Sequence, residues 1–261
     1  MRAADGTAFD INGPADAPPV VLIHGLGLHR GMWADYVTAL AADYHVLSYD
    51  LYGHGESALP PAKPSLTIYS EQLARLMDAV GMARAAIVGF SLGGMINRRF
   101  AMDHGARASG LAIIASPHER GEAGQAELEQ RARDSVDGPA ATLDAAIERW
   151  FTPDFRAANG DYIAQVRADI LRNDPKVFGE CRWVLAHGVR ELVRPRPPIT
   201  HKTLVMTAEH DSGSSPAMTH AIASEIEGAR AVVIPELQHM GVVERPDLFL
   251  PPLQSFLKEL T

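Results

Sequence analysis

One serine of this chain stands in a sequence context that favours nucleophilic chemistry. Ser91 lies between Gly89 and Gly93, after the apolar run 85–88 and before residues 95–102, which have a helical pattern. A turn that presents a serine between a strand and a helix is so tight that bulky side chains two positions away would clash, and glycines remove that clash. The pattern therefore predicts that the Ser91 hydroxyl is held out at the edge of a sheet.

A serine hydroxyl needs a base that removes its proton, and the base needs an acid that orients it. Asp211 and His239 each come just after an apolar run with the composition of a strand. Both would lie at the same edge of a parallel sheet as Ser91, where open α/β sheets bind ligands. We expect Ser91 to be the nucleophile, His239 the general base and Asp211 the acid that orients it.

Other acids and histidines compete for these roles. Glu209 lies two residues before Asp211, and Glu119 follows an earlier apolar run, so Glu119 is an alternative acid. Most of the eleven histidines, such as His104, lie in helical stretches. His239 alone follows the last predicted strand, which favours it as the base.

A tetrahedral intermediate also needs hydrogen-bond donors for its oxyanion. One donor is expected to be the backbone N–H of Leu92, directly after the nucleophile. The apolar run 19–24 leads into a His-Gly turn, which predicts a second donor in the N–H of Leu26. The side chain of His24 is then structural, with its hydrogen bonds inside the loop.

The elements that position these residues follow from the alternation of apolar runs and amphipathic stretches. Such alternation is typical of a mostly parallel sheet that helices cover on both faces. The expected helices lie at residues 32–42, 65–80, 216–227 and 247–260, besides the one after Ser91. The expected strands are residues 19–24, 45–50, 85–90, 111–115, 203–208 and 230–235.

The alternation stops between residues 118 and 199. Four helical stretches and no strand are expected there, at residues 125–135, 140–150, 162–172 and 176–187. We interpret residues 118–199 as a helical cap inserted into a core domain formed by residues 1–117 and 200–261; the alternative is that these helices cover a larger sheet. Trp150, Phe151 and Trp183 would form the roof of the substrate pocket, or else pack between the helices.

The bulk composition sets the class of protein. The chain has 261 residues, 46% of them hydrophobic, and a net charge of −8, which argues against binding to nucleic acid or anionic membranes. Cys181 is the single cysteine, the N-terminus lacks an apolar signal sequence, and no apolar run is long enough to span a membrane. We expect a cytoplasmic protein that takes a small-molecule substrate, binds no cofactor and no metal, and is compatible with a homo-oligomer.

The ordered motifs of this chain resemble the α/β-hydrolase superfamily. They are residues 24–27 (HGLG), residues 50–57 (DLYGHGES), residues 89–94 (GFSLGG), Asp211 and His239. The resemblance implies an α/β-hydrolase fold, with a mostly parallel central sheet flanked by helices and an inserted helical cap. It also implies that the stretch with Asp50 and His54 is a structural turn, and the serine separates this chain from branches that use aspartate as nucleophile.

Within that superfamily the chain is most similar to 3-oxoadipate enol-lactonases. The similarity rests on residues 24–27, on residues 150–156 (WFTPDFR) and on residues 173–175 (NDP). It implies cofactor-free hydrolysis of a small carboxylated lactone. Leu92 stands where those enzymes typically have methionine, and residues 97–99 (NRR) and the polar loop 118–124 also differ, which is expected to alter the substrate. Arg98, Arg133 and Arg167 are candidates for binding a substrate carboxylate, none of them assigned.

The motifs therefore predict a serine hydrolase that cleaves a small carboxylic ester or lactone through an acyl-enzyme. Two alternatives use the same triad: cleavage of a carbon–carbon bond in a ring-fission product of the meta-cleavage type, and a perhydrolase or cofactor-free haloperoxidase reaction. A third alternative is a binding protein with an unused triad, which the intact set of Ser91, Asp211 and His239 disfavours.

Overall fold

The fold is built on one sheet of seven strands in a computed structural model that describes residues 1–261. The order across the sheet is β1-β3-β2-β4-β5-β6-β7, and every neighbouring pair is parallel except β1 with β3. The strands are β1 (Phe9–Asn12), β2 (Pro19–Ile23), β3 (His45–Tyr49), β4 (Ala85–Phe90), β5 (Ala108–Ile114), β6 (Thr203–Ala208) and β7 (Arg230–Ile234). The mostly parallel sheet predicted from the sequence is confirmed.

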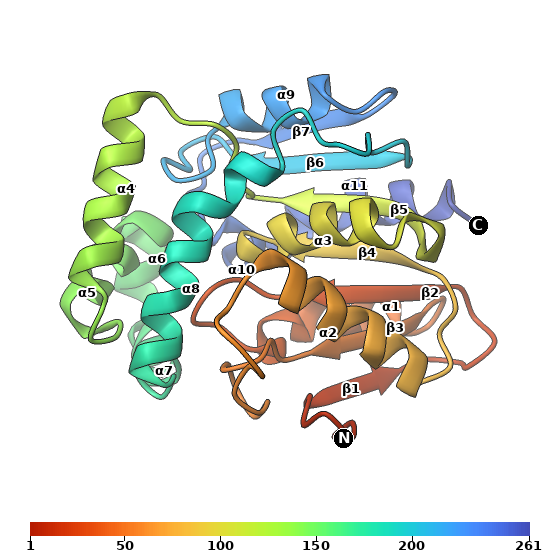
Figure 1. Cartoon of the computed structure of the whole chain (residues 1–261). Helices are drawn as coiled ribbons and strands as arrows, with labels where there is room; N and C mark the ends of the chain where they lie inside the picture. The colour runs from red at the N-terminus through yellow and green to blue at the C-terminus, as the bar shows by residue number, and fades with distance from the viewer.

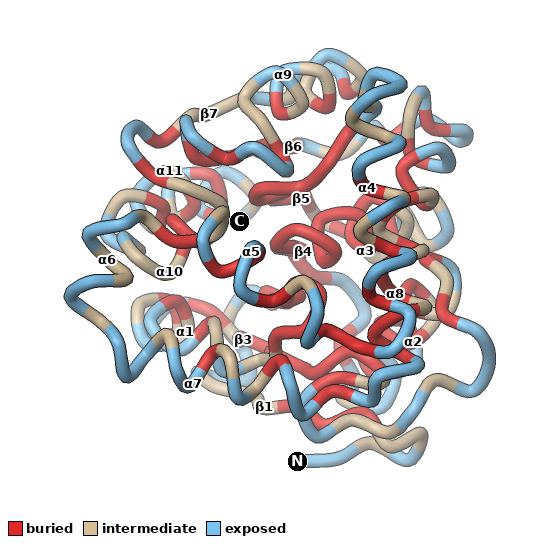
Figure 2. The backbone as a smooth tube through the Cα atoms, turned by 90° about the vertical axis from the view of Figure 1, so that its left-hand side faces the viewer, coloured by how far each residue is buried: buried red, intermediate tan, exposed pale blue.

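The six predicted strands are all present because each is a short apolar run with helices on both sides. All six residues of β4 are buried, and the centre of the molecule is buried along the strands in Figure 2. The prediction missed β1, which has only four residues, alternates apolar and polar side chains, and pairs antiparallel at the sheet edge. β5 also begins three residues earlier than expected, at Ala108 rather than at Leu111.

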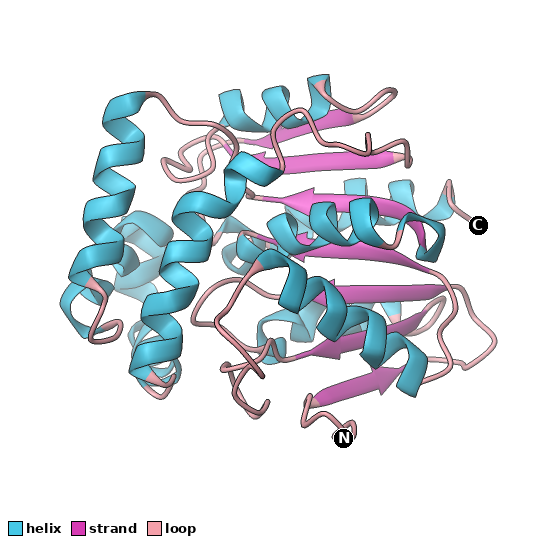
Figure 3. Ribbon diagram, viewed as in Figure 1, coloured by secondary structure: helices cyan, strands magenta, loops and turns pink.

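Helices cover both faces of the sheet. Figures 1 and 3 show α2 and α3 in front of the strands and α1 and α11 behind them. Ser65 starts α2 because its hydroxyl accepts a hydrogen bond from the Ile68 N–H at 3.2 Å, as an N-cap residue does. The α-helices outside residues 118–199 are α1 (Ala34–Leu40), α2 (Leu66–Ala79), α3 (Leu92–Asp103), α9 (Pro216–Ser224), α10 (Gly241–Glu244) and α11 (Pro246–Lys258).

Residues 118–199, which we call the inserted segment, contain five α-helices between β5 and β6. The four expected helices are present, and the structure adds α6, which starts at Pro153 behind the capping residue Thr152. Figure 1 shows these helices at the end of the molecule where the arrows of the parallel strands end. The five are α4 (Glu122–Asp134), α5 (Ala140–Trp150), α6 (Pro153–Ala158), α7 (Gly160–Leu171) and α8 (Pro175–His187).

The inserted segment shares its apolar core with the sheet. One continuous cluster of buried apolar side chains contains Ile87 and Val88 of β4 together with Ile147 and Phe151 of the inserted segment. The space between the carboxyl ends of the strands and these helices is therefore bounded by packed side chains on both sides. None of the helices combines the length and the apolar character that crossing a membrane would require.

The turn between β4 and α3 packs directly on the backbone of β2. A side-chain carbon placed on Gly93 would lie 2.3 Å from the Ile23 carbonyl oxygen and 2.7 Å from that of His24. One placed on Gly89 would lie 2.2 Å from the Gly93 carbonyl oxygen. All three distances are shorter than non-bonded atoms can approach, so glycine is required on each side of Ser91.

We expect Gly93→Ala to lower the free energy of unfolding by roughly 2 kcal/mol or more, because the added methyl group must displace backbone rather than a mobile side chain. Equilibrium unfolding in urea measures this loss. Gly160→Ala is the matched control, since nothing lies within 4 Å of a side-chain carbon at that position. It should stay within about 0.5 kcal/mol of the parent protein. Equal effects of the two substitutions would contradict this account of the turn.

Candidate active site

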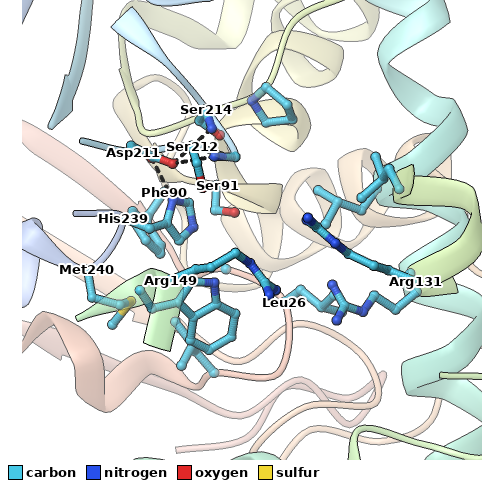
Figure 4. Close-up of a pocket in the computed structure, with 18 of the residues that line it drawn as sticks. Leu26, Phe90, Ser91, Arg131, Arg149, Asp211, Ser212, Ser214, His239 and Met240 are labelled. Carbon is cyan, nitrogen blue, oxygen red and sulfur yellow. Dashed lines mark hydrogen bonds and ion pairs between the residues drawn. The ribbon is translucent and has the colours of Figure 1, made fainter. Parts of the chain in front are cut away.

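Ser91 lies at the junction of β4 and α3 with φ 54° and ψ −111°, a conformation that residues other than glycine rarely adopt. Its N–H donates to the Ile114 carbonyl at 2.9 Å, and its carbonyl accepts from the Ser116 hydroxyl at 3.0 Å. These bonds from the neighbouring strand and its loop hold the strained turn in place. The residue is 8% exposed and lines the pocket drawn in Figure 4.

Arg98 supports this turn from beneath. Its guanidinium donates to the Gly94 carbonyl at 3.1 Å, the Ser116 hydroxyl at 3.1 Å and the Pro117 carbonyl at 2.7 Å. Burial lowers the pKa of Arg98 to about 9. The sequence prediction that residues 97–99 bear on the substrate is corrected here, because Arg98 faces the backbone below Ser91 and Asn97 donates to the Ala112 carbonyl at 2.9 Å.

His239 lies in the same pocket, in the loop after β7 (Figure 4). Its Nδ1 is 2.7 Å from the Oδ2 atom of Asp211. Its ring packs against that of Phe90, the residue before Ser91, with 4.9 Å between the ring centroids. Because a carboxylate can only accept, Nδ1 carries the hydrogen and Nε2 is free to accept a proton from another group.

Asp211 is buried in the loop after β6, where it has a full set of partners. Its Oδ1 accepts from the N–H groups of Gly213 and Ser214, both at 2.9 Å. Burial would raise the pKa of this carboxyl, but the charge of His239 and the bonds from His239, Ser214 and Gly213 outweigh it, so the pKa lies below its ordinary value. Asp211 is thus held as a carboxylate that faces the imidazole.

The two alternative acids lie elsewhere. Glu209 is exposed, and its carboxylate accepts from the Glu236 N–H at 3.0 Å. Glu119 is exposed in the loop after β5. Of the carboxylates that the sequence offered, the structure brings Asp211 to His239.

The turn after β2 approaches Ser91 closely. A side-chain carbon on Gly25 would lie 3.3 Å from the Cβ atom of Ser91. The N–H of Leu26, the next residue, donates to no acceptor in the protein. Leu92 is the first residue of α3, where a helix leaves its N–H groups without an intrahelical acceptor. Of the two amides predicted for the oxyanion, that of Leu92 directly follows the nucleophile, and that of Leu26 belongs to a pocket-lining residue and has no acceptor in the protein.

His24 has the structural role that the sequence predicted, and it is paired with His54. The Leu51 N–H donates to its Nε2 at 2.9 Å, so its Nδ1 carries the hydrogen and donates to the Gly25 carbonyl at 2.7 Å. The His54 ring lies 5.4 Å from it, centroid to centroid. Burial lowers the pKa of His24 well below its ordinary value and lowers that of His54 to about 4.

Of the three aromatic residues expected in the pocket roof, the structure brings one to the pocket. Trp150 lines it, with its ring 6.1 Å from that of His239. Phe151 follows the end of α5 in an extended conformation, which turns its side chain away to stack on Phe155 at 5.5 Å. Trp183 stacks on His187 at 5.1 Å and faces a different cleft. Phe151 and Trp183 therefore do not line the pocket.

The sequence does not predict which arginines line the pocket. Arg133 contacts Gln130, and Arg167 pairs with Asp144, both at exposed positions, and neither lines the pocket. The lining instead contains four other arginines: Arg120, Arg131, Arg149 and Arg182. Nothing in the sequence distinguishes these four arginines from the others in helical stretches, except that Arg120 belongs to the polar loop 118–124, which differs from the enol-lactonases. Only the packing of α4, α5 and α8 brings the four together.

The sequence matches the alpha/beta hydrolase family over residues 20–251. It is 27% identical to 3-oxoadipate enol-lactonase 1 of Acinetobacter baylyi, over 99% of this chain and 96% of that protein. The (E)-2-((N-methylformamido)methylene)succinate hydrolase of the same organism is 23% identical, over 93% of this chain and 91% of that protein. The crystal structure of the enol-lactonase from Burkholderia xenovorans has a TM-score of 0.86 and 28% identity, covering 97% of this chain and 96% of that one. These likenesses confirm the predicted fold.

The buried pair of His24 and His54 should make stability depend on pH. The folded state keeps His54 neutral down to about pH 4, whereas in the unfolded chain it binds a proton below about pH 6.5. Acidification from pH 7 to 4.5 should therefore remove about 2 kcal/mol or more of the free energy of unfolding. Urea unfolding at both values measures this. His54→Gln should reduce the loss and the exposed control His220→Gln should not; the same loss in both variants would argue against this origin.

Proposed function

This chain belongs to the alpha/beta hydrolase family, and we propose that it is a serine hydrolase that cleaves small carboxylic esters or lactones. The observation that carries the proposal is the 2.7 Å bond between His239 and the buried Asp211 in a pocket that Ser91 also lines. Asp211 has a lowered pKa, which suits an acid that remains ionised while it orients the base.

In the proposed reaction, His239 Nε2 takes the proton of the Ser91 hydroxyl, and the serine oxygen forms a bond to the acyl carbon. The carbonyl electron pair moves onto its oxygen, which the N–H groups of Leu26 and Leu92 stabilise. As the carbonyl re-forms, the bond to the leaving oxygen breaks, and that oxygen receives the proton from His239. His239 then takes a proton from a water molecule as the water oxygen attacks the acyl carbon. The bond between that carbon and the Ser91 oxygen breaks, the acid leaves, and His239 returns the proton to the serine oxygen.

The inserted segment is proposed to act as the cap over this site, with residues 1–117 and 200–261 as the core domain. Its five α-helices stand at the carboxyl ends of the strands and supply pocket-lining residues such as Trp150. A carboxylated ester or lactone as substrate is supported by the relatives, since one is named for an enol-lactone and another for a succinate derivative.

Ser91→Ala should reduce ester turnover by at least about 10⁴-fold, because removal of the nucleophile leaves only binding and the oxyanion donors. The panel is 4-nitrophenyl acetate, 4-nitrophenyl butyrate, 3-oxoadipate enol-lactone and a meta-cleavage dienone, each with parent and variant. Circular dichroism checks that the variant is folded. Faster cleavage of the dienone than of the esters and the lactone would point to carbon–carbon hydrolysis, and substantial residual turnover would exclude Ser91 as the nucleophile.

Asp211→Asn should lower kcat by about 10⁴-fold, because an amide no longer holds the imidazole in the tautomer that accepts from the serine. Glu119→Gln, at the alternative acid, should retain nearly full activity because that side chain is exposed and away from His239. Steady-state kinetics on 4-nitrophenyl acetate compares the two. A large loss in Glu119→Gln with little change in Asp211→Asn would reverse the assignment.

A further inference from the structure

Four arginine side chains line the pocket in front of Ser91, and all of them belong to the inserted segment: Arg120 in the loop after β5, Arg131 on α4, Arg149 on α5 and Arg182 on α8. Figure 4 shows Arg149 and Arg131 among the residues that line the same pocket as Ser91 and His239. The single carboxylate among the lining residues is Asp211, which is already bound to His239. The pocket is therefore positively charged, although the chain carries a net charge of −8.

Most of these guanidinium groups lack a carboxylate partner. Arg182 is 7% exposed, and its one hydrogen bond goes from Nη2 to Thr142 at 3.1 Å, while its Nε is buried without an acceptor. Arg120 has a buried Nη1 without an acceptor, while its Nη2 donates to the Gly213 carbonyl at 3.4 Å. Arg149 forms neither a hydrogen bond nor an ion pair, although the charges of Glu127 and Glu148 act on it. Arg131 alone reaches a carboxylate, that of Glu127 one helical turn away.

The four charges act on one another. Burial lowers the pKa of Arg120 and of Arg182 to about 10, and the charge of Arg131 contributes to both shifts. Arg149 shifts in the same direction for the same two reasons. Guanidinium groups are charged near neutral pH, so the pocket holds several like charges. A bound anion would relieve this repulsion and satisfy the free N–H donors.

We infer that the pocket binds an ester or lactone that carries at least two free carboxylates, an inference that rests on the proposed chemistry at Ser91. The planar edge of one guanidinium matches one carboxylate through two parallel hydrogen bonds. Arg120, Arg149 and Arg182 together therefore exceed what a single carboxylate satisfies, and it would leave buried charge uncompensated.

The same arginines also reach the surface. Arg120 and Arg131 line a second, outer cleft that adjoins the pocket along Leu128 and Gly213. Glu119 and Glu127 line the same cleft, so its charges are balanced, and the excess of positive charge lies in the pocket in front of Ser91.

Binding without turnover is measured first, by titration calorimetry of Ser91→Ala at low ionic strength. Succinate should bind at least about tenfold more tightly than butyrate, which has the same chain length and one carboxylate. Adding Arg149→Met should remove most of that difference, and the protein should fold because Arg149 has no internal bonds. Adding Arg133→Gln, at an exposed position of α4, should change nothing. Equal affinity for succinate and butyrate would overturn the inference, and so would inorganic phosphate binding as tightly as succinate.

Turnover then separates the inference from the proposed function. The 4-nitrophenyl esters of acetic, succinic and tricarballylic acid carry no, one and two free carboxylates. With active protein, kcat/KM should be highest for the tricarballylate ester, at least about tenfold above the succinate ester. Arg149→Met should abolish that advantage, measured as the ratio of kcat/KM for the tricarballylate and acetate esters, whereas Arg133→Gln, at an exposed position outside the pocket, should keep it. Ser91-dependent turnover without any preference for carboxylates would refute the inference alone. Tight succinate binding by a protein that hydrolyses none of the esters would refute the proposed chemistry and leave the anion site.

Discussion

The turn at Ser91 lies so close to the end of β2 that no side chain fits between the two backbones. Gly93 meets the carbonyl oxygens of Ile23 and His24, and Gly25 in turn approaches the Cβ atom of Ser91. Because β2 and β4 are paired in register from Val20 to Ile23, this contact fixes the turn that carries Leu26 relative to the nucleophile. The loops with Asp211 and His239 then follow from the strands farther along the same sheet.

The sequence predicted this part of the molecule well because each piece is encoded locally. An apolar run gives a strand, glycines around Ser91 give the turn, and the ends of parallel strands meet at one edge, so Asp211 and His239 could be placed without tertiary information. The short edge strand β1 lacked such a signal. The pocket wall could not be predicted. Which of Trp150 and Phe151 faces the site depends on where α5 ends, at Trp150, and the direction of each arginine depends on how separate helices pack.

Two kinds of buried cation lie within this one site, and they differ in how they are compensated. Arg98 has lost its contact with water but gives its hydrogens to two carbonyls and a hydroxyl, so it acts as a bracket between α3 and the loop after β5. Arg120 and Arg182 line the pocket, and each has a buried donor without an acceptor in the protein. Buried polar groups without partners are rare in folded proteins, and these two lie together in the pocket that Ser91 and His239 also line.

The arginines in the pocket affect the stability of the fold. Like charges held close together lower the stability of the fold. The helices α4, α5 and α8 therefore pack against the sheet despite the repulsion between their arginines. The continuous apolar cluster from β4 to Ile147 and Phe151 provides that anchorage. Holding these arginines together thus lowers the free energy of unfolding. The contacts between these helices and the sheet, rather than those within the sheet, would then set how much heat or mutation the fold tolerates.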